Sequence, residues 1–280
     1  MSGSTSFIEE VKSYLNSDKV KLPVFNAVAL KIQREIINEN PDVSRIEKLI
    51  TNDQALTSEV LKVSNSSFYK GLQQVTSVKS AILRLGINEV SNIVTLITHK
   101  NHFRSKNQLL NNILQKLWQH SVGCAIGSHW IAQRYGMPGA KHESFFAGLL
   151  HDVGKLLVLK VADDLKKKDE FNCQITDELL IESMDTLHSG FGFMLMKHWN
   201  FPKKYSEIAR HHHTVDFDSK NILLCMVRLA DLACNKLGIG LKTESSTALV
   251  STREAKELRL SDVDLANLEI YLEDTSAAKL

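Results

Sequence analysis

His151 and Asp152 are adjacent, and their side chains have more potential for chemistry than any other pair in the chain. A carboxylate can bridge two cations, and an imidazole nitrogen is a neutral, directional metal ligand. Apolar residues flank the pair at 145–150 and at Val153, where burying an ionised aspartate is costly unless it is paired or coordinated. Neighbouring side chains on a helix point about 100° apart, so the two meet only in a pocket lined by several helices. Taken alone, the pair also fits a hydrogen-bonded core contact.

Other reactive side chains have simpler interpretations. His99 and His102 share a helix face at i, i+3 but lack a nearby carboxylate, so we expect them to be exposed. Glu182 is expected to be solvated. The thiols at Cys124, Cys225 and Cys234 are expected to be inert core groups. No chemical role is predicted for three other histidines, His129, His142 and His198, because they have no convergent partners in the sequence. The aromatic pair Phe68 and Tyr69 is expected to pack between helices.

The elements that position these residues are predicted to be helices only. Apolar residues recur at helical spacing almost throughout, and no segment shows the alternation of a β-hairpin. A capping box at Ser44 is expected to start one helix, and another is expected to run from Ser77 to a stop at Gly86. Further helices are expected at about 114–135, 145–159, 177–199, 203–213 and 221–237. A polar stretch at 101–112 predicts three parts, namely an N-terminal helical lobe at 1–110, a helical core at 111–240 and a helical tail at 241–280.

The composition is that of an ordinary globular protein. Of 280 residues, 43% are hydrophobic and 24% are charged, which allows a sizeable core. A net charge of +2 argues against nucleic acid as a partner. The apolar runs are too short for a membrane span, and the first residues lack the features of a signal peptide. Four scattered cysteines without a CxxC pair predict a reduced, cytoplasmic protein.

The segment 148–155, which reads GLLHDVGK, resembles the signature of the HD superfamily of metal-dependent phosphohydrolases. Segments of the first half narrow the resemblance to the HDOD family, and these are LP at 22–23, NDQAL at 52–56, LKVSNSSFY at 61–69 and AILRLG at 81–86. The similarity extends from about Leu15 to Asp231. It implies a helical fold in two lobes, the second built on an HD-type core. It also implies a role in bacterial signal transduction, with signalling proteins as partners.

The resemblance further implies a set of metal ligands, which are His120, His151, Asp152, His188, His212, His213 and Asp231. Counting from Pro202 favours the last two histidines of 211–213, although the triplet leaves the register open. Such a set would hold two divalent cations, and mixed imidazole and carboxylate ligation suits Fe, Mn, Zn or Ni. In a catalytic site, Asp152 would bridge cations that activate water, and Lys155 would stabilise charge on a phosphate.

Two departures from the HD-GYP phosphodiesterases argue against hydrolysis. The histidine pair is followed by Thr-Val-Asp-Phe at 214–217 instead of a Gly-Tyr-Pro motif, and Lys116 replaces the glutamate that some relatives use for a third metal. We therefore favour a non-catalytic signalling module that binds metal or a nucleotide or phosphoester ligand. One alternative is a metal-dependent phosphohydrolase acting on a phosphodiester such as a cyclic dinucleotide. The other is an interaction scaffold with an empty pocket.

Overall fold

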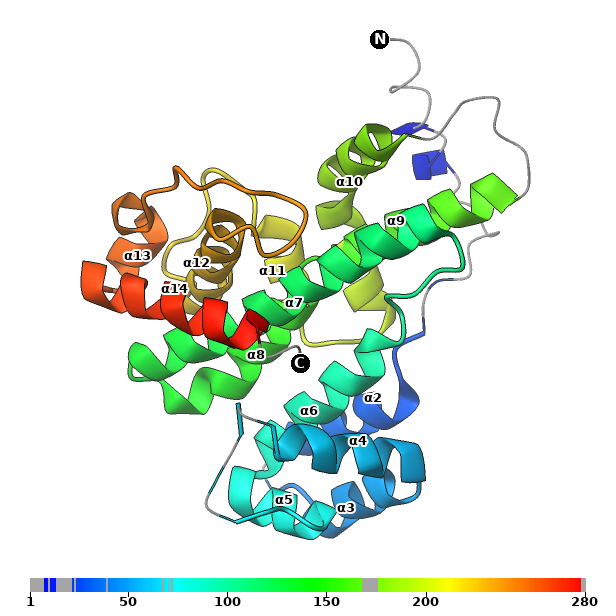
Figure 1. Cartoon of the computed structure of the whole chain (residues 1–280), viewed down its shortest axis with the longest axis vertical. Coiled ribbons are helices and arrows are strands. Elements are labelled where there is room, and N and C mark those ends of the chain that lie inside the picture. Colours follow the sequence, from blue (N-terminus) through cyan, green and yellow to red (C-terminus); the bar gives the residue numbers. More distant parts are fainter. Residues whose placement is uncertain are drawn as a thin grey trace.

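The fold is all-α and has two lobes, as predicted (Figure 1). A computed structural model describes residues 8–9, 11–13, 22, 24–38, 40–66, 68–69, 71, 73–167 and 176–277, and no strand occurs among them. Leu15, Pro23, Ser67 and Cys173 lie outside the described residues. Within the described ranges, no helix is both long enough and apolar enough to cross a membrane.

Between residues 24 and 100, the described part of the N-terminal lobe forms the helices drawn from blue to cyan in Figure 1, which are α2 (Ala27–Ile36), α3 (Val43–Thr51), α4 (Gln54–Ser64), α5 (Val78–Leu85) and α6 (Ile87–Lys100). The predicted helix start at Ser77 and the stop at Gly86 are both confirmed, and Gly86 has a φ of +86° that favours glycine. Ser77 also forms a capping box with Ser80, which was not predicted. The predicted cap at Ser44 is wrong. The side chain of Asp42 accepts a hydrogen bond from the backbone N–H of Arg45 at 3.0 Å, so α3 starts earlier.

The second lobe is built around the long helix α7 (Gln108–Arg134). Its other elements are η1 (Pro138–Ala140), α8 (Lys141–Leu150), α9 (Val153–Lys167), α10 (Asp177–His198), α11 (Lys203–His211), α12 (Ile222–Lys236), η2 (Leu249–Ser251), α13 (Arg253–Glu257) and α14 (Asp262–Ala277). Helix α7 begins before the expected start at residue 114, because the side chain of Asn107 caps it at the N–H of Leu110. The polar stretch at 101–112 is therefore partly helical.

The single helix predicted at 145–159 is interrupted at His151 and Asp152, which lie in a turn between α8 and α9. Two successive positions of one helix could not both face a common point, and the interruption removes that constraint. His151 ends α8, and the backbone carbonyl of Asp152 accepts from the N–H of Lys155 at the start of α9. The turn therefore lets the adjacent pair converge.

Two glycines beside this turn allow the helices to approach closely. A Cβ at Gly148 would lie 2.5 Å from the carbonyl oxygen of Cys124 on α7, and a Cβ at Gly154 would overlap the carbonyl oxygen of His188 on α10. Both contacts are with backbone, which cannot move aside as a side chain can. The absence of a side chain at these positions holds the His151–Asp152 turn against α7 and α10.

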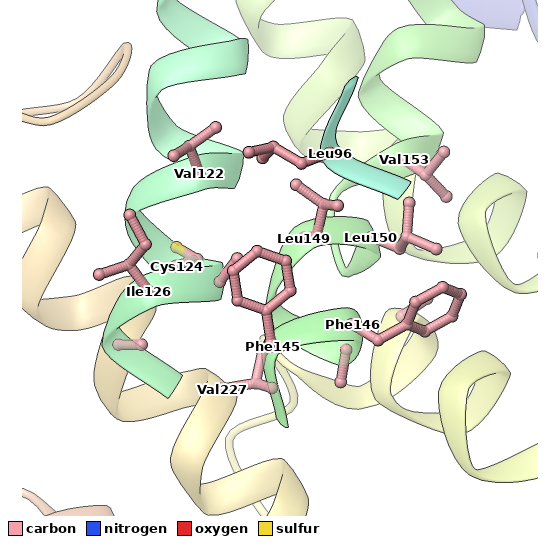
Figure 2. Packing of buried hydrophobic residues seen from close by; sticks show 14 of the residues in the cluster. Leu96, Val122, Cys124, Ile126, Phe145, Phe146, Leu149, Leu150, Val153 and Val227 are labelled. Atoms are coloured by element: carbon pink, nitrogen blue, oxygen red, sulfur yellow. The ribbon is translucent and has the colours of Figure 1, made fainter. Parts of the chain in front are cut away.

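An apolar core fixes α7, α8 and α12 around the turn (Figure 2). Phe145 and Leu149 of α8 are buried together with Val122 of α7 and Val227 of α12. Removing each such side chain from water contributes about 1.5–3 kcal/mol. Close packing of this kind leaves little freedom for the polar side chains that the same helices carry.

Candidate metal centre

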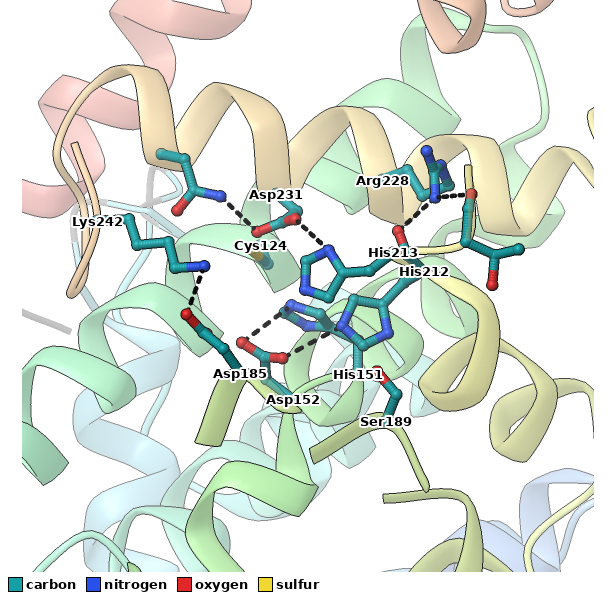
Figure 3. A network of polar contacts seen from close by, with 12 residues as sticks. Cys124, His151, Asp152, Asp185, Ser189, His212, His213, Arg228, Asp231 and Lys242 are labelled. Atoms are coloured by element: carbon teal, nitrogen blue, oxygen red, sulfur yellow. Dashed lines mark hydrogen bonds and ion pairs between the residues drawn. The ribbon is translucent and has the colours of Figure 1, made fainter. Parts of the chain in front are cut away.

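The seven residues of the predicted ligand set lie together in the second lobe, although they come from separate elements (Figure 3). Helices α7, α10 and α12 carry His120, His188 and Asp231, respectively, and the turn after α8 carries His151 and Asp152. His212 and His213 follow the end of α11. All are buried except His213, whose side chain is 42% exposed at the rim.

Asp152 lies at the middle of this group, with its two oxygens facing different histidines. Its Oδ1 is 3.2 Å from His212 Nε2 and 3.5 Å from His188 Nε2. Its Oδ2 is 3.5 Å from His151 Nε2 and 3.6 Å from His120 Nε2. This is the arrangement expected of a carboxylate that bridges two cations.

The donor atoms form two adjacent groups, and within each group they lie within 4.8 Å of one another. Subsite 1 consists of His120, Cys124, His151 and Asp231. Subsite 2 consists of Asp152, His188, His212 and His213. Each offers at least three donor atoms, which is the number that a protein metal site ordinarily needs.

Four of the imidazole rings are held in one orientation by the backbone. The Nδ1–H of each donates to a carbonyl oxygen at 2.7–3.0 Å, the partners being Ile239 for His120, Gly148 for His151, Met184 for His188 and Ala209 for His212. This contact leaves Nε2 as the free ligand nitrogen. Among the described residues, His151 Nε2 has no hydrogen-bond partner although its side chain is fully buried. An orphaned buried nitrogen of this kind fits a metal ligand.

The family profile of the HDOD domain matches residues 22–215. This chain belongs to the HDOD domain family. Its fold is shared by an HDOD protein of unknown function from Geobacter sulfurreducens, at 21% identity and a TM-score of 0.76 over 99% of this chain and 97% of that one. A protein of Shewanella amazonensis SB2B, provisionally named a metal-dependent phosphohydrolase, has 20% identity and a TM-score of 0.77 over 99% of both chains.

A curated relative is similar over part of its length. An uncharacterised protein of Treponema pallidum is 26% identical over 200 residues, which are 69% of this chain but only 38% of that protein. The HDOD chain therefore spans well under half of this relative.

Within the HDOD site, Lys155 supplies a fixed positive charge. Its Nζ lies 2.5 Å from Asp152 Oδ2, and both side chains are buried. Burial alone would raise the pKa of Asp152, but Lys155 and the surrounding imidazoles hold that pKa well below its usual range. Burial alone would lower the pKa of Lys155, and Asp152 raises it instead. The two groups form a buried ion pair, and Asp152 is a carboxylate at neutral pH.

The histidines have different charge states. Burial lowers the pKa of His188 to about 4 and that of His212 to about 3, so both are neutral at pH 7, as a metal ligand must be. Burial would also lower the pKa of His120, but Asp231, with Oδ1 3.1 Å from Nε2, raises it to about 9. His120 is therefore the imidazole that must lose a proton when it binds a cation.

The entrance to the HDOD site is narrow. Lys242, in the loop after α12, forms an ion pair with Asp185 of α10 at 3.0 Å. Beneath this pair lies a cavity of about 20 Å³, lined by residues that include Lys155 and Asp231. That volume holds about one water molecule. A much larger cavity, of about 740 Å³, lies away from the site, between the N-terminal lobe and Trp118 of α7.

The histidine triplet divides between the site and the surface. His211 faces Glu207, with Nε2 3.3 Å from a carboxylate oxygen, whereas His212 and His213 face the centre. Arg228 of α12 holds the turn that carries them, because its guanidinium donates to the carbonyl oxygens of His212 and Thr214. The structure therefore brings together the two histidines favoured by the count from Pro202.

Several predictions for single residues need correction. His99 is buried rather than exposed, and neither of its ring nitrogens has a hydrogen-bond partner among the described residues. His129 does have a partner, Glu89, at 2.9 Å. His142 lies 2.7 Å from Asn92 and 3.2 Å from Gln33, so it joins α8 to two helices of the first lobe. These partners are far away in sequence and left no local pattern.

One potential donor in the HDOD site was missed altogether. Cys124 lies one turn after His120 on α7, and its Sγ is 3.5 Å from His120 Nε2. The i, i+4 spacing from a predicted ligand places both on one face of a helix, and this was the available signal.

Proposed function

We propose that this HDOD domain is a bacterial signal-transduction module that holds divalent metal at two adjacent subsites and acts by binding rather than by hydrolysis. One observation carries the proposal most directly. Four buried imidazoles, each oriented by a backbone carbonyl, aim Nε2 at the two oxygens of Asp152. Such orientation is what metal-ligating histidines require. The Shewanella relative, provisionally named metal-dependent, is consistent with this chemistry.

The ligand residues form two sets, one for each proposed cation. His120, His151 and Asp231 would bind one cation together with Oδ2 of Asp152, while His188, His212 and His213 would bind the other together with Oδ1. Mixed nitrogen and oxygen ligation suits Fe, Mn, Zn or Ni. Bound metal would supply charge neutralisation between the helices and, given access to substrate, Lewis acidity.

Two features favour binding over hydrolysis. The cavity of about 20 Å³ beside the ligands admits water but not a phosphodiester. Asp185 and Lys242 line it, and their ion pair spans the part of its wall that is exposed to solvent. A hydrolase would have to separate this ion pair before substrate could reach Asp152.

The alternative is a metal-dependent phosphohydrolase, and the position of Lys155 supports it. Lys155 lines the same small cavity, so its ammonium would face any phosphoryl oxygen that entered. This alternative predicts hydrolysis that depends on both Lys155 and Asp152.

A nucleotide or phosphoester ligand would be accommodated better in the larger cavity between the lobes, which has about 740 Å³ of space. Its lining includes Lys62, Lys100 and Arg104, which can pair with phosphate, together with the carboxylates of Asp53 and Glu59 and an edge of Trp118. The Nε1–H of Trp118 has no hydrogen-bond partner among the described residues, although the side chain is buried. We propose that the ligand binds in this cavity and that signalling proteins respond to its binding.

Metal analysis tests the proposal with a control from the same triplet. Protein purified without chelator should carry up to two divalent ions per chain by mass spectrometry, and His212→Ala should lose most of them. His211→Ala should retain them, because His211 faces Glu207. Well under one ion per chain in the wild type would refute the metal centre.

A hydrolysis assay then separates the module from the enzyme. The metal-loaded protein and its Asp152→Asn variant are compared on a generic aryl phosphodiester. Equal background rates support the binding module. Loss of one catalytic group typically lowers a rate at least about a hundredfold. A decrease of that size in the Asp152→Asn variant would support the phosphohydrolase and contradict the binding module.

A further inference from the structure

Cys124 presents a sulfur atom to subsite 1, where no thiol ligand was expected. Its side chain is fully buried, and its Sγ belongs to the same group of donor atoms as His120, His151 and Asp231. Figure 3 shows it beneath Asp231 at the centre of the polar network. A thiolate at this point would add a sulfur donor to the three side chains of subsite 1 and to the shared Oδ2 of Asp152.

The geometry matches coordination to a single ion. In a tetrahedral zinc site, sulfur lies at about 2.3 Å and imidazole nitrogen at about 2.0 Å from the metal, which places the two ligand atoms about 3.5 Å apart. Cys124 Sγ and His120 Nε2 are 3.5 Å apart. Asp231 Oδ1 lies 3.1 Å from the same nitrogen. Both spacings are those of two ligand atoms on one ion, and the donor atoms of Cys124, His120 and Asp231 all lie within 4.8 Å of one another.

We propose that Cys124 is a thiolate ligand of the cation in subsite 1, an inference that rests on the proposed metal centre. As the metal–sulfur bond forms, the S–H bond breaks and its proton passes to water, because only the thiolate binds metal. The donor set of subsite 1 would then be two imidazoles, the thiolate of Cys124, the carboxylate of Asp231 and the shared Oδ2 of Asp152. A soft sulfur ligand favours Zn²⁺, Fe²⁺ or Co²⁺ over Mn²⁺ or Mg²⁺.

The competing explanation is an inert core thiol. In that case His120 is an imidazolium that donates to Asp231, and Cys124 only packs beside it. Two other buried cysteines provide controls for this possibility. Cys225 of α12 donates to the carbonyl of Ser219 at 3.3 Å and lies outside both subsites. Cys234 lies beside Cys124 but belongs to neither subsite.

Cobalt titration tests the assignment. Co²⁺ bound to a thiolate gives an intense near-ultraviolet charge-transfer band, which nitrogen and oxygen ligands do not give. The wild type, Cys225→Ser and Cys234→Ser should develop this band with one of the two equivalents of Co²⁺ bound. Cys124→Ser and Cys124→Ala should lack the band and keep the cobalt of subsite 2, with circular dichroism confirming that they fold.

The outcomes separate this inference from the metal centre itself. Two bound equivalents of Co²⁺ without a charge-transfer band in the wild type would overturn the thiolate ligand and leave the metal centre standing. A band that survives in both Cys124 variants would overturn it as well. Failure of the wild type to bind Co²⁺ at all would remove the proposed function and this inference with it. Zn²⁺ affinity of subsite 1 should fall at least about tenfold in Cys124→Ser, the lower limit seen for loss of an outer-shell contact.

Discussion

Lys155 Nζ and Asp152 Oδ2 lie 2.5 Å apart, and this is the same oxygen that faces His120 and His151. An ammonium group and a cation in the proposed subsite 1 would therefore share one oxygen atom. Their mutual repulsion would make Lys155 a competitor for metal, and the affinity of subsite 1 would then depend on how far the Lys155 ammonium can move from Asp152.

Replacing Lys155 by methionine should strengthen metal binding, because the competing charge is removed while most of the side-chain volume stays. Zn²⁺ affinity, measured by competition with a chromophoric chelator, should rise at least about tenfold, which corresponds to ~1.4 kcal/mol. The metal-free variant should be less stable by about 3 kcal/mol, because it leaves Asp152 buried without its partner. Lys160→Met, exposed on the same helix, is the control. Weaker Zn²⁺ binding in Lys155→Met would contradict the competition.

Substituting Gly154 by alanine should damage both stability and metal binding. The added methyl group would overlap the carbonyl oxygen of His188, so α9 or α10 must shift. We expect a loss of about 3 kcal/mol in the free energy of unfolding, measured by urea denaturation. Gly190→Ala on α10 has no heavy atom of the described residues within 4 Å of its added carbon and should instead stabilise by about 0.5–1 kcal/mol. Similar effects at the two positions would argue against the close helix contact.

Acid should destabilise the protein through buried neutral histidines outside the metal centre. Burial lowers the pKa of His99 to about 3 and that of His142 to about 4. Because these values lie below the unfolded value near 6.5, the unfolded chain binds protons first as the pH falls. The contribution of each group is complete above about pH 6.5. Below that pH it declines by about 1.4 kcal/mol per pH unit until the folded pKa is reached.

The variant His99→Phe isolates one of these groups. Phe25, Phe103 and Trp118 already surround the ring, so phenylalanine fits the chemistry of the position. It also removes two ring nitrogens that have no hydrogen-bond partner within the described part of the chain. The melting temperature should fall less between pH 7 and pH 5 than in the wild type. His198→Phe, exposed at the end of α10, should leave the pH dependence unchanged. An unchanged slope in His99→Phe would show that His99 does not control it.

Breaking the ion pair between Lys242 and Asp185 should open the site with little cost in stability. Both side chains are more than one third exposed, and such pairs contribute about 0–1 kcal/mol. In Lys242→Ala, a chelator should remove bound metal several-fold faster in stopped-flow measurements. Lys236→Ala removes a comparable pair with Glu269 at the end of α12 and serves as control. Equal rates of metal removal in the two variants would show that Lys242 does not limit access to the site.

The helical class was predictable because the spacing of apolar residues is a local property of each segment. The helix interruption at His151 and Asp152 was not predictable. Helices α8 and α9 are both buried, and apolar residues continue on either side of the turn. The cap at Asp42 was missed because Ser44 offers a similar local pattern, and only the folded backbone selects between them.

The order of the HD-type motifs along the chain predicted which residues would meet at the site. It did not predict the side chains that surround the site. Asp185 and Lys242 meet only because the loop after α12 folds over α10. His99 is buried by Phe25, a residue from a distant part of the chain. Cys124 differs from these, since its spacing from His120 was visible in the sequence and its apolar neighbours suggested only a core role.

Helix α7 extends without interruption past both the large cavity and subsite 1. Trp118 lines that cavity, and His120 and Cys124 follow on the same helix. A turn of hydrogen-bonded backbone is stiff, so any rotation of the helix at the tryptophan carries the nitrogen and sulfur donors round with it. If the proposed ligand and cation both bind, helix α7 would connect ligand binding in the large cavity with cation binding at subsite 1.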